Sequence, residues 1–417
     1  MSMNFSRPAF QDVLACLHDE EVVAIAKALI RIPSPTESEA EVAAFLATLL
    51  GGEGFQVELQ EVSPGRPQVI ARLPGQGGGR SLMFNGHMDN DSITESWRWN
   101  PYEPRVEGNR LWGAGIHNMK SGVAAMVAAG IALARSRTPL AGDLVIACVV
   151  GELQGGKGTI HMLEAGIRTD MAIVPEPYST ETIITKCVGV HKCAISTIGR
   201  SVHTSRSEEG IDAIAKALKV IAALPGLDLV NTDPDLPGLP KVLVGSIIGG
   251  RSRDYDLAGQ CNLSDYCTLI LDVRYSGDST PADLDRTFVA LLDRLQAEDP
   301  EFRYEYHHPV PPRFKVGGAD MPPTSVPVDA EIVHIVRRAH RQVTGREIER
   351  CGVVLPYSYC GNDTAHLQRA GIPCCLHGPR GYADDTEKHV RIDEMVDCAR
   401  TLAVAAVEVC GRTPAPQ

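Results

Sequence analysis

The 417-residue sequence lacks several features that would assign it to a specialised class of protein. It has 40 basic against 52 acidic residues and a net charge of −12, so the basic surface that binds a nucleic-acid backbone is missing. No uninterrupted apolar stretch approaches the ~18 residues of a membrane-spanning helix. Residues 1–11 show no basic region followed by an apolar run, so we expect no signal peptide. These absences exclude nucleic acid and membrane as expected partners and favour a cytoplasmic protein.

Paired cysteine motifs are also missing, although the chain has 12 cysteines. No two of them form a C-x-x-C pair, and several lie inside apolar runs, as Cys148 does in LVIACVV and Cys410 in VAAVEVC. A chain of this length without a secretory signal is expected in a reducing compartment. We therefore expect free thiols, most of them buried in the core.

The first part of the chain alternates between helical and strand-like patterns. Such alternation predicts a mixed, mostly parallel α/β sheet flanked by helices. The expected helices are 9–31, 38–50, 118–136 and 156–166, and the expected strands are 55–62, 68–73, 81–86, 143–150 and 171–175.

From about residue 186 the pattern changes to the order β-α-β-β-α-β, which is typical of a ferredoxin-like α+β sandwich. Its expected elements are a strand from 186, a helix at 208–224, strands at 241–248 and 266–275, a helix at 282–297 and a strand at 302–308. The proline- and glycine-rich segment 309–326 is the expected return linker. Alternation then resumes from 327 and ends in a helix at 391–411. We therefore predict a discontinuous larger domain, residues 1–187 and 312–417, with an inserted domain at 188–311.

Three expected strands end in polar residues that could share one site. His87 and Glu176 each follow such a strand directly, and Glu152 follows one after Gly151. Ligands of open α/β sheets bind at the carboxyl ends of the strands, so these side chains are expected to converge. Asp89, two residues beyond His87, could fix the tautomer of a ligating imidazole and is a candidate for the catalytic machinery.

Five motifs occur in a characteristic order along the chain: HMD at 87–89, NMK at 118–120, GEL at 151–153, EP at 176–177 and the late His389. With these motifs the chain resembles the aminoacylase/carboxypeptidase G family of metallohydrolases, which includes acetylornithine deacetylase and succinyl-diaminopimelate desuccinylase. The resemblance covers nearly the whole chain. It implies that the inserted domain is a lid and dimerisation domain, and that the enzyme is a homodimer or a higher homo-oligomer.

The resemblance also implies roles for individual residues. Glu152 would be the general base that activates the attacking water and passes its proton to the leaving nitrogen. His203, in GRSVHTS, would reach into the site of the partner subunit and stabilise the developing oxyanion. Arg274 would meet a substrate carboxylate, and Asn262 and Asn362 would make further substrate contacts.

Two positions depart from the family pattern. The Asp that bridges two metal ions in the family is Asn118 here, and the second Glu of the pair, a metal ligand in the family, is Leu153. We therefore expect a divalent metal cofactor at about one ion per chain, with manganese, zinc and cobalt all suiting the mixed nitrogen and oxygen ligands. His117, beside Asn118, is an alternative replacement ligand. The expected ligands are His87, Glu176 and Asn118, with His389 completing the shell or turning toward substrate.

These observations leave several functions open. The first is metal-dependent hydrolysis of a C–N bond in a small carboxylate-bearing substrate, such as an N-acyl amino acid or a peptide-like amide. The second is hydrolytic removal of the amino group of an aromatic amine such as 5-nitroanthranilate, because a nitro group would hold negative charge that a second ion otherwise stabilises. The third is a catalytically dead relative that only binds ligand. Retention of Glu152, His203 and the metal-ligating histidines opposes this last function.

Overall fold

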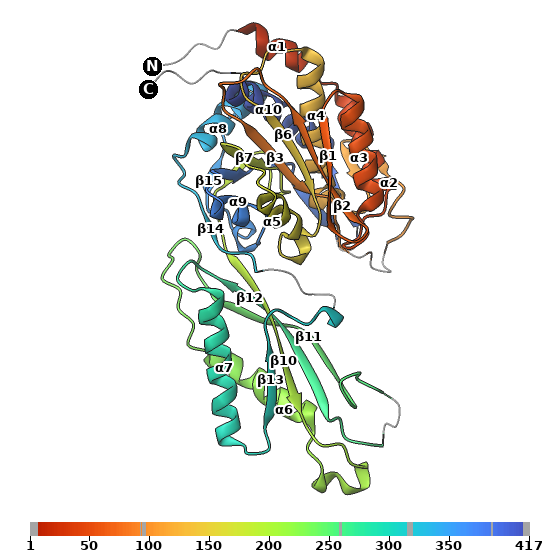
Figure 1. The fold of residues 1–417 in the computed structure, drawn as a ribbon, viewed down its shortest axis with the longest axis vertical. Helices are drawn as coiled ribbons and strands as arrows, with labels where there is room; N and C mark the ends of the chain where they lie inside the picture. Colours follow the sequence, from red (N-terminus) through yellow and green to blue (C-terminus); the bar gives the residue numbers. More distant parts are fainter. Residues whose placement is uncertain are drawn as a thin grey trace. The chain divides into compact units, whose positions relative to one another are not determined.

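The computed structural model describes residues 7–91, 93, 97–257, 261–314, 320–384 and 387–411. The chain forms two compact units (Figure 1). The larger unit comprises Met1–Cys187, Thr324–Ser358 and Asn362–Gln417, and the inserted unit comprises Val188–Pro323 and Tyr359–Gly361. The chain returns to the larger unit later than the predicted boundary at 311/312, because Met321 still pairs with Val190 of the inserted unit.

The larger unit is built on an eight-stranded sheet with the strand order β1-β2-β6-β3-β7-β16-β8-β15. β6, β3, β7 and β16 are parallel neighbours, whereas β1 and β2 join the sheet antiparallel. The mixed, mostly parallel sheet expected from the sequence is thereby confirmed. Its strands are β1 Gln56–Ser63, β2 Arg66–Leu73, β3 Leu82–His87, β6 Leu144–Val149, β7 Met171–Val174, β8 Thr182–Ile184, β15 Arg350–Gly352 and β16 Cys374–Leu376.

Helices cover both faces of this sheet, which explains why its central strands are continuously apolar. In β6, Leu144 and Ile146 belong to one core, shared with α2, α3, α4, α8 and α10, whereas Val145 and Ala147 belong to the other, shared with α5 and α9. All twelve cysteines are free, and eight of them are buried. The helices are α1 Arg7–Ala15, α2 Asp19–Arg31, α3 Ala40–Gly52, α4 Ser121–Ser136, α5 Lys157–Glu164, α8 Glu331–Thr344, α9 Thr364–Arg369 and α10 Ile392–Cys410.

Two expected helices differ from those observed. The helix expected at 9–31 is divided into α1 and α2, because His18 is extended and the acidic residues after it begin a new helix. The helix expected to start at 118 begins as α4 at Ser121, after an irregular turn, Ile116–Lys120. Asn118 within that turn has extended backbone angles, and its side chain is directed at His87.

The helical stretch Ile116–Ser136 is long and apolar enough to cross a membrane by length and composition, with a mean hydropathy of 1.2. However, 89% of this window is buried inside the protein. Its small residues pack against α10 and α2 in the core of the larger unit. This helix is therefore accounted for as a core helix.

A smaller four-stranded sheet of the larger unit has the order β17-β18-β5-β4. It consists of β4 Arg105–Glu107, β5 Arg110–Trp112, β17 Gly381–Asp384 and β18 Glu387–Arg391. The sequence did not predict it, because its strands are short and the pairing of β18 with β5 joins two hairpins that are far apart in the chain. The sheet matters for the site because β18 carries His389 and packs against the Ile116–Lys120 turn.

The inserted unit has an antiparallel sheet with the order β11-β12-β10-β13, which is the strand order of a ferredoxin-like sandwich. Two helices pack on it, and Thr280 begins the longer one, α7, with a capping box to Asp283. The elements are β10 Gly189–Ile198, α6 Ala213–Ala223, β11 Lys241–Gly250, β12 Tyr266–Tyr275, α7 Pro281–Glu298 and β13 Arg303–His307. The order of elements expected from the sequence is the order observed.

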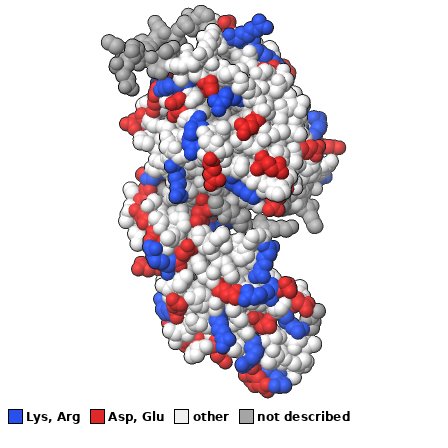
Figure 2. Space-filling model, in the orientation of Figure 1, with Lys and Arg blue, Asp and Glu red and all other residues white. Residues whose placement is uncertain are grey.

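Acidic and basic side chains are interspersed over the face drawn in Figure 2. Many surface charges form pairs, such as Arg80 with Glu331 and Arg253 with Glu305. Exposed pairs of this kind contribute about 0–1 kcal/mol each. These charges serve mainly to solvate the surface.

Candidate functional site

Three neighbouring strands of the large sheet end at one group of polar side chains. His87 is the last residue of β3, Glu152 follows β6 after Gly151, and Glu176 follows β7. Because β6, β3 and β7 are adjacent and parallel, their carboxyl ends meet at the same edge. His87 Nε2 lies 3.7 Å from Glu176 Oε1 and 3.9 Å from Glu152 Oε2. The structure therefore brings these three predicted residues together, all of them buried.

A tight turn places Glu152 at this edge. Gly151 has φ 67°, a left-handed conformation that a residue with a Cβ rarely adopts, and the chain then enters the short 3-10 helix Glu152–Gln154. The Asp89 carboxylate accepts the backbone N–H groups of Glu152, at 3.1 Å, and Leu153, at 3.3 Å. Asp89 thus ties the loop after β3 to the turn after β6.

The orientation of His87 is set by the backbone next to it. His87 Nδ1 lies 2.8 Å from the main-chain oxygen of Asp89, so an N–H on Nδ1 donates to that carbonyl. Burial lowers the pKa of His87, but the hydrogen bond to Asp89 and the charges of Glu176 and Glu152 outweigh this and raise it well above 6.5. A metal ion would take the place of the proton on Nε2, which lies 3.1 Å from Asn118 Oδ1. Asp89 contacts the ring through its carbonyl, while its carboxylate, 3.5 Å from His87 Nδ1, holds the Glu152 turn. The role expected for Asp89 in fixing the tautomer stays a prediction.

Asp363 is a buried carboxylate at this site that sequence reasoning missed. It precedes α9, and neither of its carboxylate oxygens makes a hydrogen bond of good geometry within the described residues. Burial is the main cause that raises the pKa of Asp363 to about 7; His87 opposes this rise, and the charge of Glu176 adds to it. The motif GNDT at 361–364 is visible in the sequence, but the resemblance points to Asn362 rather than to Asp363.

The charges at this site fit a divalent cation. Burial raises the pKa of Glu152 well above 4.5; His87 opposes this, and the negative charges of Glu176 and Asp363 add to it. Burial likewise raises the pKa of Glu176. Within the described part of the chain, no lysine or arginine forms an ion pair with these carboxylates. Buried carboxylates around one imidazole, with oxygens left unpaired, form a donor set that suits a hard or borderline divalent metal ion.

Two further histidines belong to the turn and small sheet beside this site. His389 on β18 is buried between the rings of Trp112, at 4.1 Å between centroids, and Tyr382, at 5.0 Å. His117 is mostly buried, and burial lowers its pKa to about 3, with the charges of Lys388 and His87 acting in the same direction. Both rings are therefore placed by packing, and His117 is held neutral.

The inserted unit holds three of the predicted site residues. His203 and Asn262 form a bridge between antiparallel segments, so two residues predicted separately lie side by side. The backbone N–H of Ser205 donates to His203 Nδ1, which leaves the proton of the neutral, exposed ring on Nε2. Arg274 already forms a two-pronged pair with Asp272, at 2.6 and 2.9 Å.

Asn362 has a structural role in the larger unit. Its side-chain oxygen accepts the backbone N–H of Thr364 at 3.1 Å and also the Thr364 hydroxyl, and so supports the start of α9. Asn362 therefore helps to position the neighbouring Asp363.

A buried ion pair supports the 3-10 helix Glu152–Gln154, and its removal gives a stability prediction. Arg66 donates through Nε to Glu39 Oε2 at 2.9 Å and through Nη1 to Gln154 Oε1 at 2.8 Å. Arg66→Ala is expected to destabilise the larger unit by about 3–5 kcal/mol, because Glu39 would remain buried without a cation. Denaturant unfolding should detect this, while Arg105→Ala, which removes an exposed pair with Glu107, should change stability by at most about 1 kcal/mol. Equal stability of the two variants would contradict the prediction.

Comparison with known proteins decides the family. Residues 83–408 match Peptidase family M20/M25/M40, and this range exceeds half of the chain. The chain belongs to this family. The resemblance inferred from the five motifs is thereby confirmed, and this M20-family protein is a metal-dependent C–N hydrolase of the amidohydrolase type.

Relatives of this M20-family enzyme act on different small molecules. An N-formyl-4-amino-5-aminomethyl-2-methylpyrimidine deformylase of Halalkalibacterium halodurans is 27% identical over 97% of this chain and 99% of the relative. A succinyl-diaminopimelate desuccinylase of Methylobacterium sp. is 36% identical, but over 39% of this chain and 43% of the relative. Of these two relatives, the deformylase is the one that this chain matches over nearly its full length.

Solved structures share the fold of this M20-family enzyme. A tripeptidase of Staphylococcus aureus is 16% identical with a TM-score of 0.72, covering 94% of this chain and 99% of that chain. A dinuclear metal binding peptidase of Bacillus subtilis from the M20 family is 17% identical with a TM-score of 0.64, covering 94% and 98%. At these identities the similarity shows a common fold.

Proposed function

We propose that this enzyme hydrolyses the amide bond of a small N-acyl amine, with Glu152 as the general base. The observation that carries this proposal is the buried Glu152 carboxylate beside His87 and Glu176. Its raised pKa, caused mainly by burial, favours proton exchange nearer neutral pH than an exposed glutamate would allow. A carboxylate of this kind can take a proton from water and return it to a leaving nitrogen.

The residues of the site divide the remaining tasks. His87, Glu176 and Asn118 would hold a divalent ion, and Asp363 adds a carboxylate to this donor set. When bound, such an ion supplies Lewis-acid polarisation of the scissile carbonyl and a lower pKa of the attacking water. The backbone oxygen of Asp89 would fix the tautomer of His87, and its carboxylate holds the turn at Glu152. Manganese, zinc and cobalt all suit this set, and about one ion per chain remains our proposal.

Two residues of the inserted unit, His203 and Arg274, are the proposed contacts to the substrate. His203 carries its proton on Nε2 when neutral, which makes it a donor suited to a developing oxyanion. Arg274 would have to leave part of its pair with Asp272 to bind a substrate carboxylate. We therefore propose that recognition depends less on a carboxylate than expected, in keeping with the N-formyl aminomethylpyrimidine substrate named for the full-length relative.

The homodimer stays a prediction, and one feature of the inserted unit supports it. β11 is an edge strand of the sheet, and its Leu243 and Ile247 side chains are 58% and 49% exposed. Pairing of this edge with a second copy would cover both side chains.

A substrate panel tests the proposed function. Metal-stripped protein is reloaded separately with Mn²⁺, Zn²⁺ and Co²⁺ and offered an N-formyl aminomethylpyrimidine, N-succinyl-diaminopimelate, an acetylated amino acid and 5-nitroanthranilate. We expect formate release from the first substrate at the highest kcat/KM. If ammonia is released from 5-nitroanthranilate and no other substrate is turned over, the proposed amide hydrolysis is wrong and the enzyme is an aromatic deaminase. No turnover with any substrate, together with a ligand-induced rise in Tm, would support a binding protein instead.

A further inference from the structure

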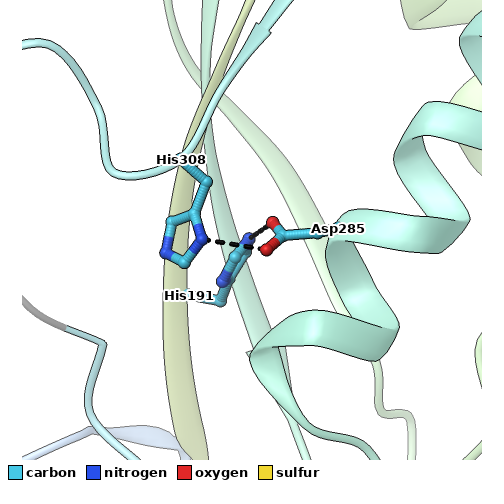
Figure 3. Close-up of side chains that lie close together, drawn as sticks. All are labelled: His191, Asp285 and His308. Atoms are coloured by element: carbon cyan, nitrogen blue, oxygen red, sulfur yellow. Dashed lines mark hydrogen bonds and ion pairs between the residues drawn. The ribbon is translucent and has the colours of Figure 1, made fainter.

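A second group of metal-ligating side chains lies in the inserted unit. His191 on β10, Asp285 on α7 and His308 just after β13 point toward one another (Figure 3), with ligand atoms within 4.8 Å. His191 Nε2 lies 3.4 Å from Asp285 Oδ1, and His308 Nδ1 lies 3.0 Å from Asp285 Oδ2. Tetrahedral zinc with bonds of about 2.0–2.2 Å separates its ligand atoms by roughly 3.3 Å. The separations of Asp285 from both rings are therefore close to those between the ligand atoms of one zinc ion.

A second carboxylate faces the far side of the two imidazoles. Asp320 Oδ1 lies 3.1 Å from His191 Nδ1, and Asp320 Oδ2 lies 3.0 Å from His308 Nε2. Ligating histidines nearly always direct their other ring N–H to a carboxylate, carbonyl or water, which fixes the tautomer. Asp320 lies at ion-pair distance from this outer nitrogen of each ring, where such a carboxylate would hold the rings of two ligating histidines. The nitrogens that remain, His191 Nε2 and His308 Nδ1, face Asp285. His308 Nδ1 donates to Asp285 Oδ2 at 3.0 Å, and a bound cation would replace the proton of that hydrogen bond.

The close approach of the two rings favours a cation between them and Asp285. His191 is completely buried, and its ring lies 4.2 Å from that of His308, centroid to centroid. Two protonated imidazoles at this distance would repel each other in a region of low dielectric constant. One divalent ion balances the two aspartates while both rings stay neutral. The hydroxyl of Tyr306, which donates to Asp285 Oδ1 at 2.5 Å and lies 3.3 Å from His191 Nε2, adds an oxygen at the same place.

We propose that the inserted unit binds a divalent transition-metal ion, such as Zn²⁺, through His191 Nε2, His308 Nδ1 and the Asp285 carboxylate. The ion joins β10, α7 and the chain that leaves β13, so it fixes the last strand of the sandwich to its sheet and helix. This site is separate from the strand-end site of the larger unit, and it does not depend on the proposed amide hydrolysis.

Zinc titration of the full chain tests the proposal. The background variant H87A/E176A removes two proposed ligands of the strand-end site, and its Zn²⁺ affinity is measured by competition with a chromophoric chelator. We expect about one tightly bound ion to remain per chain. Adding Asp285→Asn or His308→Asn should weaken that binding by more than about 100-fold, and Asp320→Asn by about 10–100-fold. Zinc should also raise the Tm of the background variant, but not when His308 is replaced.

His307→Asn is the matched control, since His307 is the neighbouring histidine and faces Glu305 rather than the group. Zinc binding should be unchanged in this variant. If the background variant does not fold, the two histidine substitutions are compared in the otherwise unaltered chain, where only His308→Asn should lower bound zinc by about one ion. Equal zinc content and affinity in the two variants would overturn the proposal and leave the group as an ion-pair network of imidazoles and carboxylates.

Discussion

Glu152→Gln is expected to lower kcat by about 10²–10⁴-fold while metal content stays unchanged. Glutamine has the size of glutamate but cannot accept the proton of the attacking water. The turn itself should persist, because Asp89 holds it through the backbone N–H groups of Glu152 and Leu153 rather than through the Glu152 side chain. Steady-state kinetics on the preferred substrate and elemental analysis of the same preparation measure both quantities.

The control for this substitution is Glu164→Gln, which makes the same chemical change at an exposed glutamate at the end of α5. Its kcat should equal that of the parent enzyme. A kcat for Glu152→Gln within a few-fold of the parent would remove Glu152 as the base. Loss of metal from the same variant would instead show that Glu152 acts as a ligand.

Restoring the two carboxylates that the family pattern contains is expected to change the metal count. In the double variant N118D/L153E, bound divalent metal should rise from about one to about two ions per chain. Asn118 lies 3.1 Å from His87 Nε2, and Leu153 follows Glu152 directly, so both new charges enter a site that already holds buried carboxylates. Without metal these charges would repel one another, and the variant should melt at a lower temperature than the parent. Elemental analysis and thermal unfolding, with and without chelator, test this expectation.

The matched control is N118D/L153Q, which has the same side-chain sizes but one negative charge fewer. It should bind less metal than N118D/L153E. About two ions per chain in the H308N variant, with Asn118 and Leu153 unaltered, would show that the single-ion proposal is wrong, with His117 or Asp363 as the residues to examine as ligands. These counts should be made in the H308N variant, so that metal in the inserted unit does not enter the comparison.

Much of the catalytic core could be predicted because its signals are local. A strand that is buried on both faces reads as an unbroken apolar run, and the first polar residue after it marks the carboxyl edge of the sheet. This pattern predicts His87, Glu152 and Glu176 as site residues. In the structure a carboxylate oxygen of Glu152 and one of Glu176 each lie within 4 Å of His87 Nε2. The ferredoxin-like order of the inserted unit followed from the same kind of periodicity.

The remaining features depend on contacts between distant segments. Asp363 is recognised as part of the site through its burial beside His87 and Glu176, since Asn362 next to it has the same local sequence context. His389 has its place because β18 pairs with β5, which no periodicity in these short strands reveals.

The sequence by itself therefore indicated the family through the order of its five motifs. It also indicated the mixed α/β sheet, the ferredoxin-like order of the inserted unit and the residues at the strand ends, because hydrophobic periodicity and turn residues specify local structure. Only the tertiary structure decided which carboxylates are buried away from solvent and which imidazole nitrogen faces the site. It also decided that ligand atoms of His191, Asp285 and His308 lie within 4.8 Å of one another. Burial and proximity are properties of packing, and packing joins residues that the chain itself keeps far apart.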